Sequence, residues 1–112
     1  MQSEYLLFAL GLCAKAGKMI FGVPMICEAM GGKKLPIIVL AASDNAKNSA
    51  KRLQDKCRFY GVTLYQSDIA GETLAHVVGK TGRLAAVGIT DQNLAILVEK
   101  HVKAFSAREE EE

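Results

Sequence analysis

The sequence PIIVLAA at residues 36–42 is an unbroken apolar run near the middle of the chain. A strand with one face in water alternates polar and apolar side chains, whereas a strand covered on both faces is apolar throughout. The run therefore predicts the central strand of a sheet that has helices on both sides.

Segments on either side of this run alternate between helical spacing and short apolar stretches. The helical spacing is clearest over residues 45–60, where apolar residues recur at intervals of four, three, four and three, at Ala46, Ala50, Leu53, Cys57 and Tyr60. Further helices are expected at 4–15 after Ser3 as the N-cap, at 23–31 after Gly22, up to residue 78 after Ser67 or Asp68 as the N-cap, and from 92 after Asp91. Further strands are expected at 18–21, 62–66 and 84–89.

Helices that alternate with short buried strands are typical of a sheet covered on both faces, so we predict an α/β fold, a three-layer α/β/α sandwich. Neither a linker nor an internal repeat divides the chain. We therefore predict a single domain over residues 1–105, followed by an acidic tail over residues 106–112. Glutamates at a C-terminus oppose the helix dipole, so the last helix is expected to end before the glutamate run at 109–112.

Composition and cysteine usage indicate a globular protein of a reducing compartment. Half of the 112 residues are hydrophobic, 23% are charged and the mean hydropathy is +0.14, which excludes the composition of a disordered chain. The three cysteines lie at unequal spacings that suit neither a disulfide framework nor a zinc motif. No basic residue precedes the apolar run at 5–14, and no uncharged apolar stretch approaches the roughly 18 residues of a membrane span. We therefore expect a cytoplasmic protein that does not enter a membrane.

The positive charge of the chain lies outside its last residues. The formal net charge is +2, but four of the twelve acidic residues are residues 109–112. Residues 1–108 consequently carry fourteen basic against eight acidic side chains, a net charge of +6. A basic body of this size is compatible with a polyanionic partner.

Patterns associated with catalysis or cofactors fail in their spacing or context. The sequence GKT at 79–81 resembles the end of a phosphate-binding loop, but Leu74 stands where the first glycine of that loop would be, and a strand follows instead of a helix. Cys13, Cys27 and Cys57 lie on apolar helical faces, and neither G-x-S-x-G nor H-E-x-x-H occurs. We therefore predict no enzymatic activity, no cofactor, no metal site and no small-molecule substrate.

Basic residues and glycines gather instead in loops and at helix ends. Lys18 begins the first expected strand, Gly22 opens the second helix and Lys33 follows its end. Lys80 and Arg83 flank the turn before the last strand. Basic groups next to glycine turns and helix N-termini are typical of surfaces that bind nucleic-acid phosphates.

Several pieces of the sequence occur in the order and at the spacing of a known family. They are LGLCAKAGK at 10–18 with Gly22 after it, the strand at 36–42 followed by SDN, DKCRFYGV at 55–62, Leu74 with VGK at 78–80, and AAVGITD at 85–91. In these pieces the chain resembles the kink-turn-binding ribosomal proteins, the L-seven-Ae and L-thirty-e group, and especially their small bacterial YlxQ-type members. The resemblance covers about residues 4–101.

This resemblance implies a four-stranded mixed sheet and a ribonucleoprotein role, with structured RNA, above all ribosomal RNA, as the partner and ribosomal proteins as further candidates. In the family, RNA meets the start of the second helix and the loop before the last strand. Those elements correspond here to residues 22–27 and 79–83, with Lys18 beside them. Together with the basic loops, they give the candidate RNA-binding residues Lys18, Gly22, Val23, Pro24, Met25, Lys33, Lys80, Thr81 and Arg83.

The chain departs from the family at the start of the second helix. RNA-binding members carry Asn-Glu-x-x-Lys at the positions that Pro24, Met25 and Glu28 occupy here. Two functional hypotheses follow: a non-enzymatic, ribosome-associated RNA-binding protein, and a protein-interaction or ribosome-assembly module that keeps the fold but has lost kink-turn recognition. A small enzyme is the remaining alternative.

Overall fold

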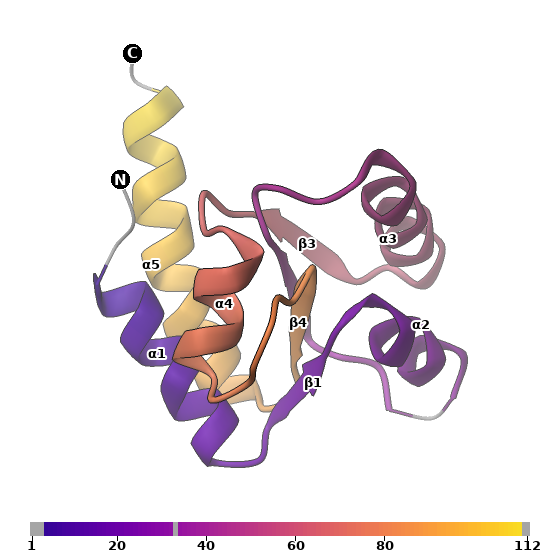
Figure 1. Ribbon diagram of the computed structural model, residues 1–112, viewed down its shortest axis with the longest axis horizontal. Coiled ribbons are helices and arrows are strands. Elements are labelled where there is room, and N and C mark those ends of the chain that lie inside the picture. Colours follow the sequence, from indigo (N-terminus) through magenta and orange to yellow (C-terminus); the bar gives the residue numbers. More distant parts are fainter. Residues whose placement is uncertain (1–3, 33, 111–112) are drawn as a thin grey trace.

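A computed structural model describes residues 4–32 and 34–110, and the side chains of these ranges up to residue 102. Within them the chain forms five helices and four strands (Figure 1). The helices are α1 (Glu4–Lys15), α2 (Val23–Gly31), α3 (Lys47–Tyr60), α4 (Gly71–Val77) and α5 (Gln92–Glu110). The strands are β1 (Met19–Phe21), β2 (Ile38–Ala41), β3 (Thr63–Gln66) and β4 (Ala86–Ile89).

The four strands form one mixed sheet in the order β1-β4-β2-β3. Strand β4 is antiparallel to both β1 and β2, whereas β2 and β3 are parallel. All four residues of β2 and all four of β4 are buried, as expected for inner strands covered on both sides. The prediction that the apolar run at 36–42 forms a central strand is therefore confirmed.

Helices cover both faces of this sheet, which confirms the predicted α/β/α sandwich. Helices α1, α4 and α5 lie on one face and helices α2 and α3 on the other (Figure 1). Each face has its own hydrophobic cluster, one centred on Leu10, Leu40 and Val98 and the other on Ile26, Val39 and Leu53. The sheet thus holds the start of α2 and the loop before β4 on one rigid support.

Helix α4 begins later than its sequence predicts. It starts at Gly71, after Ala70, and not directly after Ser67 or Asp68. The Ser67 hydroxyl instead donates to the Ala41 carbonyl at 2.7 Å and accepts from the Ile69 N–H at 3.2 Å. The hydroxyl therefore stabilises the turn after β3, and a carboxylate from a distant loop takes over the capping of α4, as described below.

Helix α5 begins as predicted and ends later than predicted. The Asp91 carboxylate accepts a hydrogen bond from the Leu94 N–H at 2.9 Å, which confirms Asp91 as the cap. The helix extends to Glu110, although the glutamate run was expected to lie beyond its end. Alanine, arginine and glutamate are among the strong helix formers, and their preference outweighs a dipole term of about 0.3–1 kcal/mol.

All three cysteines are buried on inner helix faces, as predicted. Burial raises the pKa of Cys13 to about 11, with the nearby Asp91 carboxylate adding to the shift, and burial likewise raises the pKa of Cys57 to about 11. A thiol with a raised pKa stays protonated near neutral pH and is a poor nucleophile. These two side chains therefore act as packing groups.

Replacement of Cys13, Cys27 or Cys57 by alanine is expected to lower the free energy of unfolding by about 0.5–1.5 kcal/mol each, because each change leaves a small cavity in the core. Thermal or denaturant unfolding of the three variants measures this loss. Ligand binding of the folded variants should match the wild-type protein. Stoichiometric zinc in the purified protein would contradict a purely structural role.

Candidate nucleic-acid interface

The start of α2 is fixed to the sheet and presents unpaired backbone donors. The Gly22 N–H donates to the Ala86 carbonyl at 2.9 Å, and the Ile26 N–H donates to the Gly22 carbonyl at 3.0 Å. Because Pro24 has no N–H, the first-turn donors without a partner inside the helix are those of Val23 and Met25. No acidic side chain and no side-chain cap occupies this turn. The arrangement favours an anion at the N-terminus of α2.

The side chains of α2 divide sharply between core and solvent. Those of Val23, Ile26, Cys27 and Met30 are buried against the sheet. Pro24, Met25 and Glu28 are exposed, and 55% of Met25 is accessible to solvent. The three positions that depart from the family's pattern therefore form one solvent-facing surface at the beginning of the helix.

The turn over residues 79–83 lies against Phe21, the last residue of β1. The Lys80 ammonium nitrogen stands 4.4 Å from the centroid of the Phe21 ring. Gly79 and Gly82 have φ angles of +78° and +77°, in the left-handed region that favours glycine, so the turn can double back at both points. A cation over an aromatic face is held in place while its N–H groups remain available to an anion.

Arg83 at the end of this turn is tied to a distant loop. One nitrogen of its guanidinium donates to the Asp44 carboxylate at 2.8 Å and to the Asp44 carbonyl at 3.2 Å. The same carboxylate accepts from the Gly71 N–H at 2.9 Å and so caps α4. The Gly71 N–H, and then the Arg83 guanidinium, hold the pKa of Asp44 below its ordinary value of 3.8. The hydrogen bonds to the ionised Asp44 carboxylate therefore stabilise the fold above pH 4, and this stabilisation is lost as the pH falls through the lowered pKa.

The structure brings most of the candidate residues to one edge of the sheet. This edge contains the end of β1 and the beginning of β4, because the two strands are antiparallel. The residues at the edge are Gly22, Val23, Pro24, Met25, Lys80, Thr81 and Arg83. Val23 is buried there, so it offers its backbone N–H and not its side chain.

Two candidate residues, Lys18 and Lys33, are not among those that the described ranges place at this edge. Lys18 is exposed at the other end of β1, where its carbonyl accepts a hydrogen bond from the Thr90 N–H at 3.0 Å. Lys33 lies outside the described residues.

The sequence does not predict the part that two residues, Phe21 and Asp44, have in this interface. The sequence predicts Phe21 only as part of a strand, and its position directly before Gly22 is the signal that an aromatic ring accompanies the helix start. Asp44 precedes α3 in the sequence, yet its carboxylate caps α4. A pairing between positions 44 and 71 leaves no local signal in the sequence.

The described residues contain no group of three or more His, Cys, Asp or Glu side chains placed to hold a metal ion. Among the helices of the same ranges, none has both the length and the apolar character needed to cross a membrane.

The sequence and the fold of the chain were compared with those of known proteins. No family model matches the chain. The RNA-binding protein YlxQ of Bacillus subtilis (strain 168) is 30% identical over 86 residues, which cover 77% of this chain and 83% of that protein. A solved structure of a protein with unknown function from Bacillus halodurans superimposes with a TM-score of 0.74 at 26% identity, over 87% of this chain and 99% of that one.

A more distant solved structure extends the likeness of fold. The Giardia lamblia 15.5kD RNA binding protein superimposes with a TM-score of 0.69 at 18% identity, over 96% of this chain and 92% of that one. The identity to YlxQ over most of both sequences carries the family assignment, and the superpositions agree with it. The chain belongs to the YlxQ type of the L-seven-Ae and L-thirty-e family.

Proposed function

We propose that this protein binds structured RNA, above all ribosomal RNA, in the cytoplasm and without catalysing a reaction. The proposed surface consists of the start of α2 and the turn over residues 79–83. Membership of the YlxQ type supports RNA as the partner, since the Bacillus subtilis relative carries the name of an RNA-binding protein.

The observation that carries the proposal is the contact between Lys80 and Phe21 at 4.4 Å. It sets an exposed ammonium group beside the N-terminus of α2, where the Val23 and Met25 N–H groups are available. Phosphate groups are bound both by cations and by helix N-termini, so two adjacent phosphates of a bent RNA backbone fit this surface.

The remaining candidate residues have distinct parts in the proposed complex. Pro24 and Met25 offer an exposed apolar surface to unstacked bases, and Thr81 offers a hydroxyl from the exposed turn. Arg83 holds the turn against Asp44. Lys18, at the other end of β1, would contact a phosphate further along the backbone, and Lys33 is proposed as an outer contact on its charge alone.

The second candidate function is a protein-interaction or ribosome-assembly module. It is favoured by the side chains at the start of α2, where Met25 is 55% exposed between the apolar Pro24 and the acidic Glu28. Such a surface offers neither the amide nor the cation that family members present to RNA at these positions. Ribosomal proteins are the proposed partners in that case.

A salt titration of RNA binding separates the two candidates. Contacts with several phosphates make the logarithm of the affinity fall linearly with the logarithm of the salt concentration. The RNA-binding function predicts such a slope, and a flat line favours the protein partner. A pull-down with and without RNase, scored for ribosomal RNA and ribosomal proteins, then identifies the partner.

Substitution Lys80→Ala is expected to weaken RNA binding across sequences and to reduce the salt slope by about 0.7–0.9, the change expected for the loss of one phosphate contact. Arg83→Ala should weaken binding with a smaller change of slope, because Asp44 already neutralises the guanidinium. Lys47→Ala, at the exposed start of α3, is the matched control. An unchanged slope in the Lys80 variant would place the phosphate site elsewhere.

A further inference from the structure

Helix α1 carries a stripe of four residues that is outside the proposed RNA surface. Glu4, Phe8, Gly11 and Lys15 follow one another at intervals of four, three and four, so they lie on one line along the helix. Glu4 and Lys15 are exposed at its two ends, and Phe8 is 68% exposed near its middle. The stripe therefore presents a negative end, an aromatic side chain, a position without a side chain and a positive end.

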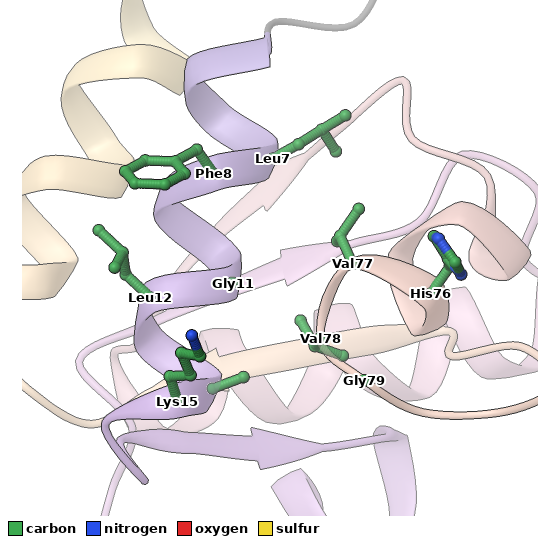
Figure 2. Close-up of a pocket in the computed structure, with 10 residues that line it drawn as sticks. Leu7, Phe8, Gly11, Leu12, Lys15, His76, Val77, Val78 and Gly79 are labelled. Atoms are coloured by element: carbon green, nitrogen blue, oxygen red, sulfur yellow. The ribbon is translucent and has the colours of Figure 1, made fainter.

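A groove of about 650 Å³ runs along this stripe between α1 and the end of α4. Figure 2 shows Phe8 and Leu12 on one side of α1 and Val77 and Val78 across from them, with Gly11 between. A Cβ atom on Gly11 would lie 3.3 Å from the Val77 carbonyl oxygen, so glycine permits the close approach of the two helices. Gly11 therefore lies against the end of α4 and adds no side chain to the groove.

The apolar residues of this surface are more exposed than packing inside one chain requires. Phe8 is 68% exposed and Leu12 is 37% exposed. Contiguous exposed apolar groups of this kind are typical of protein interaction sites. Among the described residues that line the groove, Lys15 and His76 are basic or titratable and none is acidic. The occupant of the groove should therefore bring apolar groups and a carboxylate.

The same stripe on a second copy of the chain, running antiparallel to the first, supplies both an apolar group, Phe8, and a carboxylate, Glu4. In an antiparallel copy, Glu4 stands opposite Lys15, and Phe8 stands opposite Gly11. We propose that α1 is a self-association surface through which two copies of this chain pair antiparallel about a two-fold axis, with Phe8 of each copy in the groove of the other.

The physical chemistry of the pairing favours this orientation. A two-fold axis makes each contact occur twice, so the interface gains two Phe8–Gly11 contacts and two Glu4–Lys15 ion pairs. Phe8 meets the one position of the stripe that has no side chain. A parallel pair would set Glu4 against Glu4 and Lys15 against Lys15, which like-charge repulsion disfavours.

The inference does not rest on the proposed RNA binding. Helix α1 covers one face of the sheet and α2 covers the other (Figure 1). Pairing through α1 leaves the start of α2 exposed on both copies, so the dimer would present two α2 surfaces to its partners.

The first test measures mass against concentration by sedimentation equilibrium, without RNA. The wild-type protein is expected to rise from 12.1 kDa toward twice that mass as the concentration increases to about 1 mM. Phe8→Ser should raise the dissociation constant of the dimer at least about tenfold, as expected for a central aromatic anchor. Phe59→Ser is the matched control, because Phe59 is 80% exposed on α3 and should leave the mass unchanged from wild type. A wild-type protein that stays monomeric, or a Phe8 variant that behaves like the Phe59 variant, overturns the proposal.

The second test fixes the register through charge reversal. Glu4→Lys and Lys15→Glu should each weaken self-association. In either homodimer, the residues at positions 4 and 15 then carry the same charge, and this repulsive contact occurs twice. An equal mixture of the two variants should dimerise again, since every contact in the mixed pair joins a lysine to a glutamate. Circular dichroism of each variant checks that α1 stays helical. Single variants that dimerise like the wild type, or a mixture that remains monomeric, overturn the antiparallel pairing.

Discussion

The combined substitution Pro24→Asn, Met25→Glu and Glu28→Lys is expected to raise the affinity for a standard kink-turn RNA at least about tenfold over the wild-type chain. Asparagine and glutamate side chains carry polar atoms that can pair with base edges, which proline and methionine lack. Glu28→Lys changes the local charge by +2 and Met25→Glu changes it by −1, so the triple variant gains one positive unit beside a polyanion. The three changes restore the pattern that RNA-binding members of the family carry at the start of this helix.

The structure indicates that the triple variant will fold. All three positions are exposed on α2, whereas the inner face of the helix consists of Val23, Ile26, Cys27 and Met30. Loss of the proline changes little, because an N–H in the first turn of a helix has no partner within the helix. The fixed bond from the Gly22 N–H to the Ala86 carbonyl also keeps the start of α2 in place.

The size of the expected gain follows from the value of a base contact. A good contact to a base edge is worth about 1–3 kcal/mol, by analogy with DNA recognition. Two restored contacts together with a more favourable charge should therefore exceed the error of a binding assay. Electrophoretic mobility shift or calorimetric titration against a kink-turn and a straight duplex measures the gain and its specificity.

Asp55→Lys is the control for charge: it adds two positive units on the exposed side of α3, whereas the triple variant adds one in total. This control should bind kink-turn and straight duplex with nearly equal small gains. If the wild-type chain already binds the kink-turn as tightly as the triple variant, side chains at positions 24, 25 and 28 do not decide recognition. Backbone N–H groups of α2 with Lys80 would then have to supply it.

Gly71→Ala is expected to lower the free energy of unfolding by about 1–3 kcal/mol. A Cβ atom at this position would lie 2.8 Å from the Leu84 carbonyl oxygen and 2.7 Å from a guanidinium nitrogen of Arg83. The guanidinium can move, but the backbone carbonyl is held because the Leu84 N–H donates to the Gly71 carbonyl at 2.9 Å. The overlap therefore outweighs the usual preference of a helix for alanine over glycine.

The same substitution should also weaken RNA binding, because it displaces Arg83 and with it the turn over residues 79–83. Chemical denaturation and an RNA titration measure the two effects on one preparation. Gly31→Ala is the control: the nearest atom to its added Cβ is the Tyr60 hydroxyl oxygen at 3.9 Å, so this helical substitution should be neutral or stabilising. Equal stability of the Gly71 variant and the wild type would contradict the close approach of α4 to the loop that precedes β4.

The sequence predicted the elements of the fold because local signals specify them. The apolar run at 36–42 marks an inner strand, and the spacing of residues 45–60 marks an amphipathic helix, in both cases through side chains close together in the chain. Gly17 and Gly61 end their helices with φ angles of +71° and +69°, as a glycine after a helix predicts. The later start of α4 was not predictable in this way, because its cap is supplied by Asp44, 27 residues earlier.

The candidate site was predicted only in part for the same reason. The sequence by itself determined that Gly22 opens α2, that Pro24 and Met25 replace the family's polar residues, and that Lys80 lies in a glycine turn. Only the tertiary structure decided that Lys80 stands over Phe21 and that Arg83 is held by Asp44, while Lys18 remains at the opposite end of β1. Helices and strands are encoded by neighbours in the chain, but contacts between loops depend on the order and direction of the strands, which set β1 antiparallel to β4 and bring their ends together.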